Sequence, residues 1–176
     1  MQMNTSSHRS FSIFIHHYFK RLFFTFTLLA ALTGLPVSAA ATDGVEALLA
    51  NEEAPAGVIF EIVGGDAATL GKLLAGIRAD IERLRIRFPE LPVAIVSHGE
   101  EQFALTTDNR ANDPELHAIA ESIVTGEQVD LHVCGTYAGW FGVDPGDFPA
   151  YVDVAAAGPA QINDYRALGY VLITLP

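Results

Sequence analysis

Short apolar runs rich in β-branched residues alternate with segments of helical periodicity from about residue 57 onward. The apolar runs cover residues 58–63, 93–96, 131–134, 152–155 and 170–173. Strands of this near-continuous apolar kind are buried on both faces, which is typical of parallel sheets covered by helices. The alternation therefore predicts an α/β fold, a three-layer α/β/α sandwich around a mostly parallel sheet of about five strands.

Two long helices are expected between these strands. Leucine and isoleucine recur at intervals of three and four between residues 70 and 84, and Asp66 precedes them as a good N-cap. A second helix is expected over residues 114–124, with Asp113 as its cap and Gly126 at its end.

Glycines and charged residues delimit the remaining helical segments. Gly158 and the proline after it open a helix over residues 160–168, and Gly169 closes that helix before the last strand. Glu100 and Glu101 are interpreted as the polar first turn of a helix, where carboxylates are favourable.

The first forty residues have the pattern of a secretory signal peptide. Lys20 and Arg21 precede an uncharged apolar run over residues 22–35, and small residues then offer cleavage near Ala39 or Ala41. A retained membrane anchor is the alternative, but the run is shorter than the roughly 20 apolar residues that span a bilayer. We therefore expect a signal peptide over residues 1–41, a lead-in segment over 42–56 and a folded domain over 57–176, located in the periplasm or secreted.

The net charge of the chain limits the classes of molecule that it is expected to bind. It has 10 Lys and Arg against 21 Asp and Glu, and three of the basic residues lie in the leader, which has no acidic residue. Removing the leader leaves seven basic against 21 acidic residues, a net charge of −14. Such a surface repels nucleic-acid phosphates and offers little attraction to anionic lipids. We therefore expect no nucleic-acid partner and no stable membrane association after cleavage.

Cys134 is the single cysteine, and it lies where an apolar strand runs into Gly135. An exported protein with one thiol cannot form an internal disulfide, which leaves a buried bystander, an intermolecular bridge or a reactive sulfur. In open α/β sheets, functional groups gather beyond the carboxyl ends of the strands. The position of Cys134 at such an end favours the reactive sulfur.

His98 and several glycines are expected at the same edge of the sheet. If the strands that end at His98 and Cys134 are neighbours, the imidazole could help to deprotonate the thiol. A short helix around residues 137–141 would add a favourable dipole. Cys134 and His98 are therefore the candidate catalytic residues. The candidate ligand-binding residues around them are Gly64, Gly65, Gly99, Gly135 and Tyr137.

Metal and nucleotide sites find little support in the sequence. His132 shares a strand face with Cys134, and a metal pair completed by His98 or His117 is conceivable, but no CxxC or HxxxH spacing accompanies them. Gly64 and the following glycine lack the further residues of a dinucleotide loop or a P-loop. We therefore predict no metal and no cofactor.

Four segments of the chain resemble the DsrE/DsrF-like family of sulfur-relay proteins. They read VAIVSHG, DLHVCGTYAGWFG, YVDVAAAGPAQINDY and RALGYVLI, and the resemblance covers about residues 57–176. It implies a parallel α/β/α fold, assembly as dimers, trimers or hexamers, and a persulfide carried by the cysteine that Cys134 matches. The Gly135-Thr136 pair and the leader are like those of an exported, uncharacterised branch of the family.

Three functional hypotheses follow. The first is a periplasmic sulfur-handling protein, at most a sulfur transferase or carrier, in which Cys134 carries persulfide sulfur between donor and acceptor proteins. The second is a noncatalytic module for small-ligand binding or assembly, with the cysteine incidental. The third is a small redox or metal-handling protein that uses Cys134 with His132. A homo-oligomer is expected in each case, with Tyr137, Trp140 and Phe141 as interface anchors.

Overall fold

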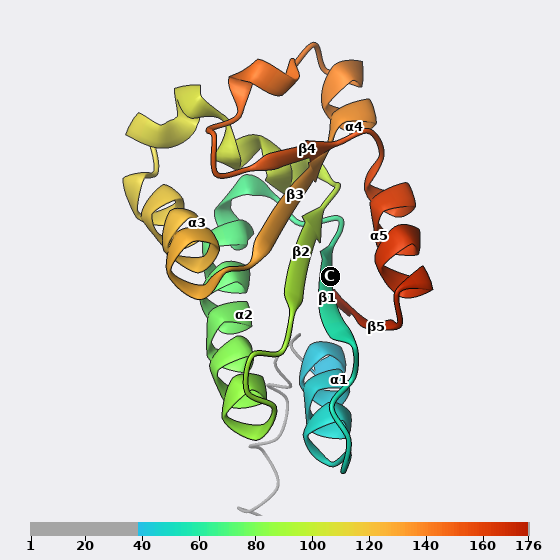
Figure 1. Ribbon diagram of the computed structural model, residues 1–176. Helices are drawn as coiled ribbons and strands as arrows, with labels where there is room; N and C mark the ends of the chain where they lie inside the picture. The colour runs from blue at the N-terminus through green and yellow to red at the C-terminus, as the bar shows by residue number, and fades with distance from the viewer. Residues whose placement is uncertain (1–38, 176) are drawn as a thin grey trace, which may run out of the picture. The chain divides into compact units, whose positions relative to one another are not determined.

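The computed structural model describes residues 39–175, so most of the expected signal peptide lies outside the described residues. Figure 1 shows five strands side by side, with helices on both faces of the sheet. All four strand pairs are parallel, and the strand order is β4-β3-β2-β1-β5. This arrangement confirms the predicted α/β/α sandwich. The strands are β1 (Gly57–Ile62), β2 (Val93–Ser97), β3 (Asp130–Cys134), β4 (Asp153–Ala155) and β5 (Tyr170–Leu175).

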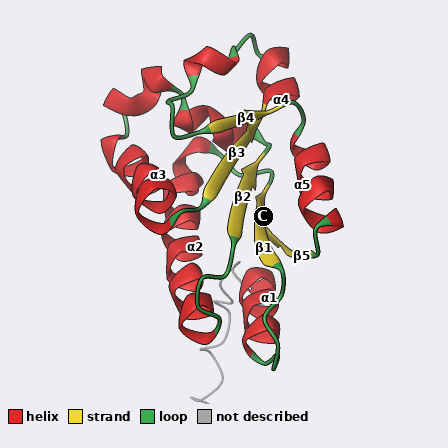
Figure 2. Ribbon diagram, in the orientation of Figure 1, coloured by secondary structure: helices red, strands yellow, loops and turns green. Residues whose placement is uncertain are grey.

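Helices cover the two faces of the sheet unequally, as the secondary-structure colouring in Figure 2 makes plain. Three helices, α1 (Ala39–Leu49), α2 (Ala67–Arg87) and α3 (Pro114–Glu127), share one face, while α5 (Gly158–Ala167) covers the other. The short helix α4 (Gly135–Trp140) follows β3 directly. Three 3-10 segments complete the description: η1 (Glu100–Leu105), η2 (Thr107–Ala111) and η3 (Pro145–Asp147).

The helix boundaries agree with the sequence except at the end of α3. Asp66 and Asp113 cap α2 and α3 by accepting hydrogen bonds from backbone N–H groups three residues on, at 2.9 and 3.0 Å. The prediction that Gly126 ends α3 was wrong. The helix continues to Glu127, and Gln128 takes the left-handed conformation at φ 54°. The chain turns there because residue 129 must already enter the core.

The larger core lies between the sheet and the three helices on its first face. The α2 residues predicted from their spacing are buried there, together with Phe60, Ile62 and Val133 from the strands. The lead-in segment also contributes, since Val45 and Leu48 of α1 are buried in this core. The hydrophobic packing of the domain therefore begins before residue 57.

A smaller core lies under α5 and contains the alternate strand residues. Ile59, Ala94 and Val96 point to this face and pack against Ile162 and Tyr165. Because side chains alternate along a strand, Glu61, His98, His132 and Cys134 belong to the same face. None of the helices within residues 39–175 is long and apolar enough to cross a membrane.

Two histidines are buried as neutral hydrogen-bonding groups. His117 lies 2.6 Å from the Tyr151 hydroxyl through Nδ1 and 3.1 Å from the Ala104 carbonyl oxygen through Nε2. His132 Nε2 lies 2.9 Å from the Tyr165 hydroxyl, which donates to Asp130 Oδ2 at 2.9 Å. Burial lowers the pKa of both imidazoles, because a charged ring loses its hydration there.

These lowered pKa values predict acid-dependent stability. Below the ordinary histidine pKa of 6.5, the unfolded chain binds protons that His117 and His132 resist in the folded state. The free energy of unfolding should therefore fall as the pH drops below 6.5, by up to about 1.4 kcal/mol per pH unit for each histidine. Urea unfolding between pH 7.5 and 5 measures this slope. A His117→Gln, His132→Gln variant should show a shallower slope, and an unchanged slope would contradict the assignment.

Candidate functional site

The carboxyl ends of β1, β2 and β3 meet at one edge of the sheet, and the candidate residues lie there. Strand β2 runs between β1 and β3, with Ile62 paired to Ser97 and Ser97 paired to Val133. Continuing this register by one residue puts His98 opposite Cys134. The two strands that carry the candidate catalytic residues are therefore neighbours.

Cys134 is the last residue of β3 and the N-cap of α4. Its backbone N–H donates to Gln102 Oε1 at 2.8 Å, and its Sγ accepts a hydrogen bond from the Tyr137 backbone N–H at 3.4 Å. Only 5% of the residue is exposed. The sulfur therefore lies beside one N–H donor, in a residue that is almost fully buried.

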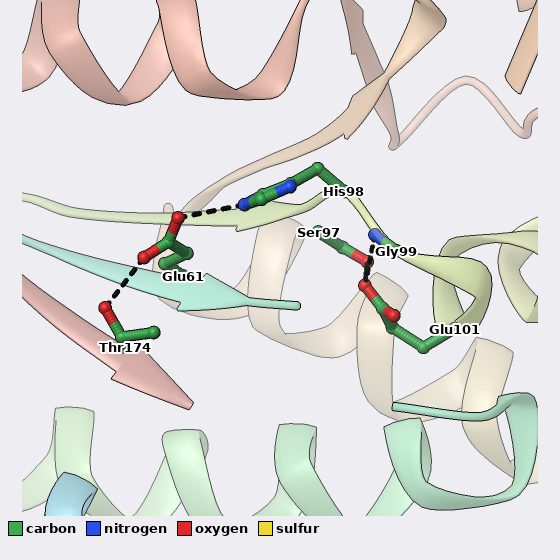
Figure 3. A network of polar contacts seen from close by, with 6 residues as sticks. All are labelled: Glu61, Ser97, His98, Gly99, Glu101 and Thr174. Atoms are coloured by element: carbon green, nitrogen blue, oxygen red, sulfur yellow. Dashed lines mark hydrogen bonds and ion pairs between the residues drawn. The ribbon is translucent and has the colours of Figure 1, made fainter. Parts of the chain in front are cut away.

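His98 follows β2 directly, and its ring is turned toward β1 (Figure 3). His98 Nε2 lies 2.9 Å from Glu61 Oε1, and the other oxygen, Glu61 Oε2, accepts from Thr174 Oγ1 at 2.7 Å. Because both carboxylate oxygens are occupied, the orientation of the imidazole is fixed and Nδ1 is the nitrogen left for another partner. Action of His98 on the thiol of Cys134 stays a prediction.

The first residue of α5 closes over His98. A Cβ atom placed on Gly158 would lie 2.7 Å from His98 Cβ and 3.1 Å from its Cγ. No side chain fits between them, so only glycine lets the start of α5 approach β2 this closely. The glycine that opens α5 therefore also packs the back of the imidazole.

Glu101 lies in the first turn of η1, as expected, but it is buried on the opposite face of the β2 end. Its exposed fraction is 0%, and Oε1 accepts from Ser97 Oγ and from the Gly99 backbone N–H, both at 2.8 Å (Figure 3). Its other oxygen, Oε2, has no hydrogen-bond partner within residues 39–175. The carboxylate therefore organises the turn after β2 and keeps one acceptor unused.

The remaining candidate glycines pack closely against the chain. A Cβ on Gly99 would collide with Glu101 Oε2 and lie 2.7 Å from the Gly64 backbone nitrogen. Gly64 has φ +85°, a conformation that favours glycine. A Cβ on Gly65 would lie 2.8 Å from Thr69 Oγ1, and one on Gly135 would lie 3.0 Å from the Ala155 carbonyl oxygen. Close packing accounts for Gly65, Gly99 and Gly135, and the positive φ accounts for Gly64, around which a Cβ would meet nothing within 4 Å. Ligand binding at these glycines stays a prediction.

An aromatic cluster lies on and beside α4. Tyr137 and Phe141 have ring centroids 5.1 Å apart, and Phe103 of η1 lies 5.3 Å from Phe141. Trp140 lies 5.9 Å from Tyr137. The candidate residue Tyr137 therefore joins the cysteine to a set of partly exposed rings.

His117 and His132, the possible metal partners of Cys134, form hydrogen bonds with other residues. His117 binds Tyr151 and Ala104, and His132 binds Tyr165. Within residues 39–175, no three His, Cys, Asp or Glu side chains gather in a way that could hold a metal ion.

Sequence reasoning missed four residues of this edge: Glu61, Glu101, Gln102 and Thr174. Glu61 carried a usable signal, because a carboxylate inside the apolar run VIFEIV needs a partner in a buried strand. Gln102 and Thr174 carried none, since their partners lie on elements distant in the sequence. Gln102, for example, reaches Cys134 across 32 residues.

These features define the protein as a five-stranded parallel α/β sandwich with a lone thiol at the carboxyl edge of its sheet. Comparison with protein-family models and with curated proteins finds no match. Two solved structures share the fold, each with a TM-score of 0.52.

The first is the protein of unknown function MTH1491 from Methanobacterium thermoautotrophicum. It is 19% identical, and the match covers 67% of this chain and 97% of that chain. The second is the YchN protein from E. coli, which is 16% identical, with 68% of this chain and 99% of that chain covered. At these identities the likeness concerns the fold alone, and it supports a distant DsrE-like fold, as the sequence resemblance implied.

Proposed function

We propose that this protein carries sulfur on Cys134, as a persulfide, in the periplasm or outside the cell. The observation that supports the proposal most directly is the position of Sγ. The chain's single thiol lies at the carboxyl edge of the sheet and accepts a hydrogen bond from the first turn of α4. A backbone N–H aimed at the sulfur favours a negatively charged sulfur over a neutral one.

The chemistry requires no cofactor. The thiolate of Cys134 attacks the outer sulfur of a donor persulfide R–S–SH, so that a new S–S bond forms and the donor S–S bond breaks. The donor leaves as the thiolate R–S⁻, and the product is Cys134–S–SH. Attack of an acceptor thiolate on the outer sulfur then returns Cys134 as a thiolate. The transferred sulfur keeps its oxidation state throughout, so no external oxidant or reductant is needed.

The low exposure of Cys134 suits storage between encounters. The outer sulfur of a persulfide on a widely exposed cysteine is open to attack by any small thiol. The 5% exposed fraction of Cys134 restricts access to small donors or a docked partner. We assign the proton exchanges that accompany loading and release to His98, whose imidazole is held by Glu61.

A second candidate function is noncatalytic binding of a small ligand at the same edge. The observation that favours it is Glu101, whose buried Oε2 is an unused acceptor beneath the Gly64 and Gly99 turns. In that case the cysteine is a packing residue of β3, which its low exposure also allows.

Sulfur loading distinguishes the two functions. We expect purified protein incubated with inorganic polysulfide to gain the mass of one sulfur atom, to lose it on treatment with dithiothreitol, and to show no gain in Cys134→Ser. Intact-protein mass spectrometry measures each step. The His98→Gln variant should load at least about tenfold more slowly, as expected for loss of a general base. If the wild type gains no sulfur although its denatured form is fully alkylated at Cys134, the thiol is inert and the ligand-binding function stands.

A further inference from the structure

The rings beside Cys134 form an exposed surface, which we call the aromatic surface: Phe103, Tyr137, Trp140 and Phe141. Trp140 is 75% exposed and Phe141 is 57% exposed, although aromatic side chains normally bury most of their area. The rings contact one another, with centroid distances between 5.1 and 5.9 Å. A cluster of large rings held together yet left open to solvent has the composition of a binding hot spot.

Acidic residues flank the members of the aromatic surface along the chain. Glu100 precedes Phe103 in η1, and Asp144 and Asp147 follow Phe141 by a few residues; all three are exposed. Partial desolvation, reinforced by the charges of Glu100 and Glu101, raises the pKa of Tyr137.

The same region is poor in positive charge. The two segments that build this end of the sheet, residues 88–109 and 135–165, contain no lysine or arginine. Arg110, which follows the first segment, lies 3.0 Å from Glu121 and is paired with it. The surface therefore combines exposed rings with uncompensated negative charge.

The aromatic surface also adjoins the thiol. Helix α4, which carries Tyr137 and Trp140, begins immediately after Cys134, and the Tyr137 backbone N–H donates a hydrogen bond to the sulfur. A partner that binds to these rings therefore contacts the helix whose first turn donates a hydrogen bond to the sulfur.

We propose that the aromatic surface is the docking site for a second protein whose contact face is apolar and rimmed by lysine or arginine. The aromatic rings supply the binding energy, and the flanking acidic residues select the partner and speed its approach. A second copy of this chain, expected from the sequence to use the same rings, is the less favourable partner, because residues 42–176 have seven basic against 21 acidic residues and two copies of this surface would face each other with like charges. That the partner exchanges sulfur with Cys134 rests on the proposed function; the docking itself does not.

Trp140 makes the test direct, because it is the single tryptophan of the chain. The probe is a synthetic amphipathic peptide of leucine and arginine without cysteine, compared with the same peptide carrying glutamate in place of arginine. We expect the basic peptide to shift Trp140 emission to shorter wavelength and to bind at least about tenfold more tightly than the acidic one, with affinity falling as salt is added.

Matched variants locate the binding. Phe141→Ser should weaken binding of the basic peptide about fivefold or more, as expected for loss of a hot-spot ring. Ile86→Ser, which removes an even more exposed apolar residue on α2, should leave binding unchanged. Glu100→Lys should weaken binding, whereas Glu53→Lys, in the exposed connection before β1, should not.

The peptide-binding test and the sulfur-loading test give independent results. Cys134→Ser should bind the basic peptide as the wild type does, so docking stands even if no sulfur is ever loaded. Equal binding of both peptides, or equal effects of Phe141→Ser and Ile86→Ser, would overturn the proposal. A blue shift that grows with protein concentration alone, lost in Phe141→Ser together with a dimer in sedimentation, would show a second copy instead. A shift with phosphatidylcholine vesicles alone would show a lipid surface instead.

Discussion

Replacing Gly99 with alanine is expected to lower the free energy of unfolding by about 1–3 kcal/mol, the usual cost of forcing an extra group into a packed site. The new methyl group would meet Glu101 Oε2 and the backbone nitrogen of Gly64 at the same time. Since one of these neighbours is backbone, rotation of a side chain cannot relieve the contact. The turn after β2 must shift, and with it the hydrogen bonds from Gly99 and Ser97 to Glu101.

Gly76→Ala is the matched control for this substitution. Gly76 lies inside α2, and a Cβ atom there would meet nothing within 4 Å. Alanine is the better helix former, so this variant should be about 0.5–1 kcal/mol more stable than the wild type. Urea unfolding measures both variants. A Gly99→Ala protein as stable as the wild type would contradict this prediction, because it would mean that the turn around Glu101 has room for a methyl group.

Replacing Tyr165 with phenylalanine is expected to cost about 1–3 kcal/mol, because it leaves a buried polar group without a partner. The Tyr165 hydroxyl joins His132 Nε2 to Asp130 Oδ2, at 2.9 Å on each side. Phenylalanine keeps the ring in the smaller core but removes the acceptor that His132 needs. Burial and the Asp130 hydrogen bond raise the pKa of Tyr165, so the hydroxyl is protonated at neutral pH.

Tyr170→Phe is the control for that variant. The Tyr170 ring contacts Tyr165 at a tilt of 45°, with ring centroids 4.9 Å apart, but its hydroxyl makes no hydrogen bond within the described residues. Its removal should therefore change the free energy of unfolding by no more than about 0.5 kcal/mol. The two variants should differ in chemical unfolding and in the NMR titration of His132, which only Tyr165→Phe should alter. Equal losses in both would assign the effect to ring packing.

The fold followed from the sequence because its signals are local. The apolar runs and the leucine and isoleucine spacing of α2 report burial directly, and Asp66 and Asp113 act as caps through residues three positions away. The predicted end of α3 at Gly126 was wrong because a local signal alone does not fix where a helix ends. Glycine permits a helix to end but does not force it, and the approach of the chain to the core moved the left-handed residue to Gln128.

The candidate site was predictable only in part. Cys134 and His98 were found because strand ends mark the functional edge of a parallel sheet, and the structure places both there. Their partners were not found. Glu61 lies 37 residues before His98, and Thr174 lies 113 residues after Glu61, so no sequence spacing connects them. Glu101 looked like a surface residue because neighbouring charges in a sequence usually mark a solvated turn.

The sequence by itself determined the order of strands and helices along the chain and the presence of a single thiol at a strand end. Periodicity and capping are short-range properties, so a short stretch of sequence is enough to recognise them. Only the tertiary structure decided that β2 lies between β1 and β3, that His98 turns to Glu61, and that Glu101 is buried beneath Gly99. Strand order and side-chain partners depend on contacts between distant segments, and those contacts exist only once the sheet has formed.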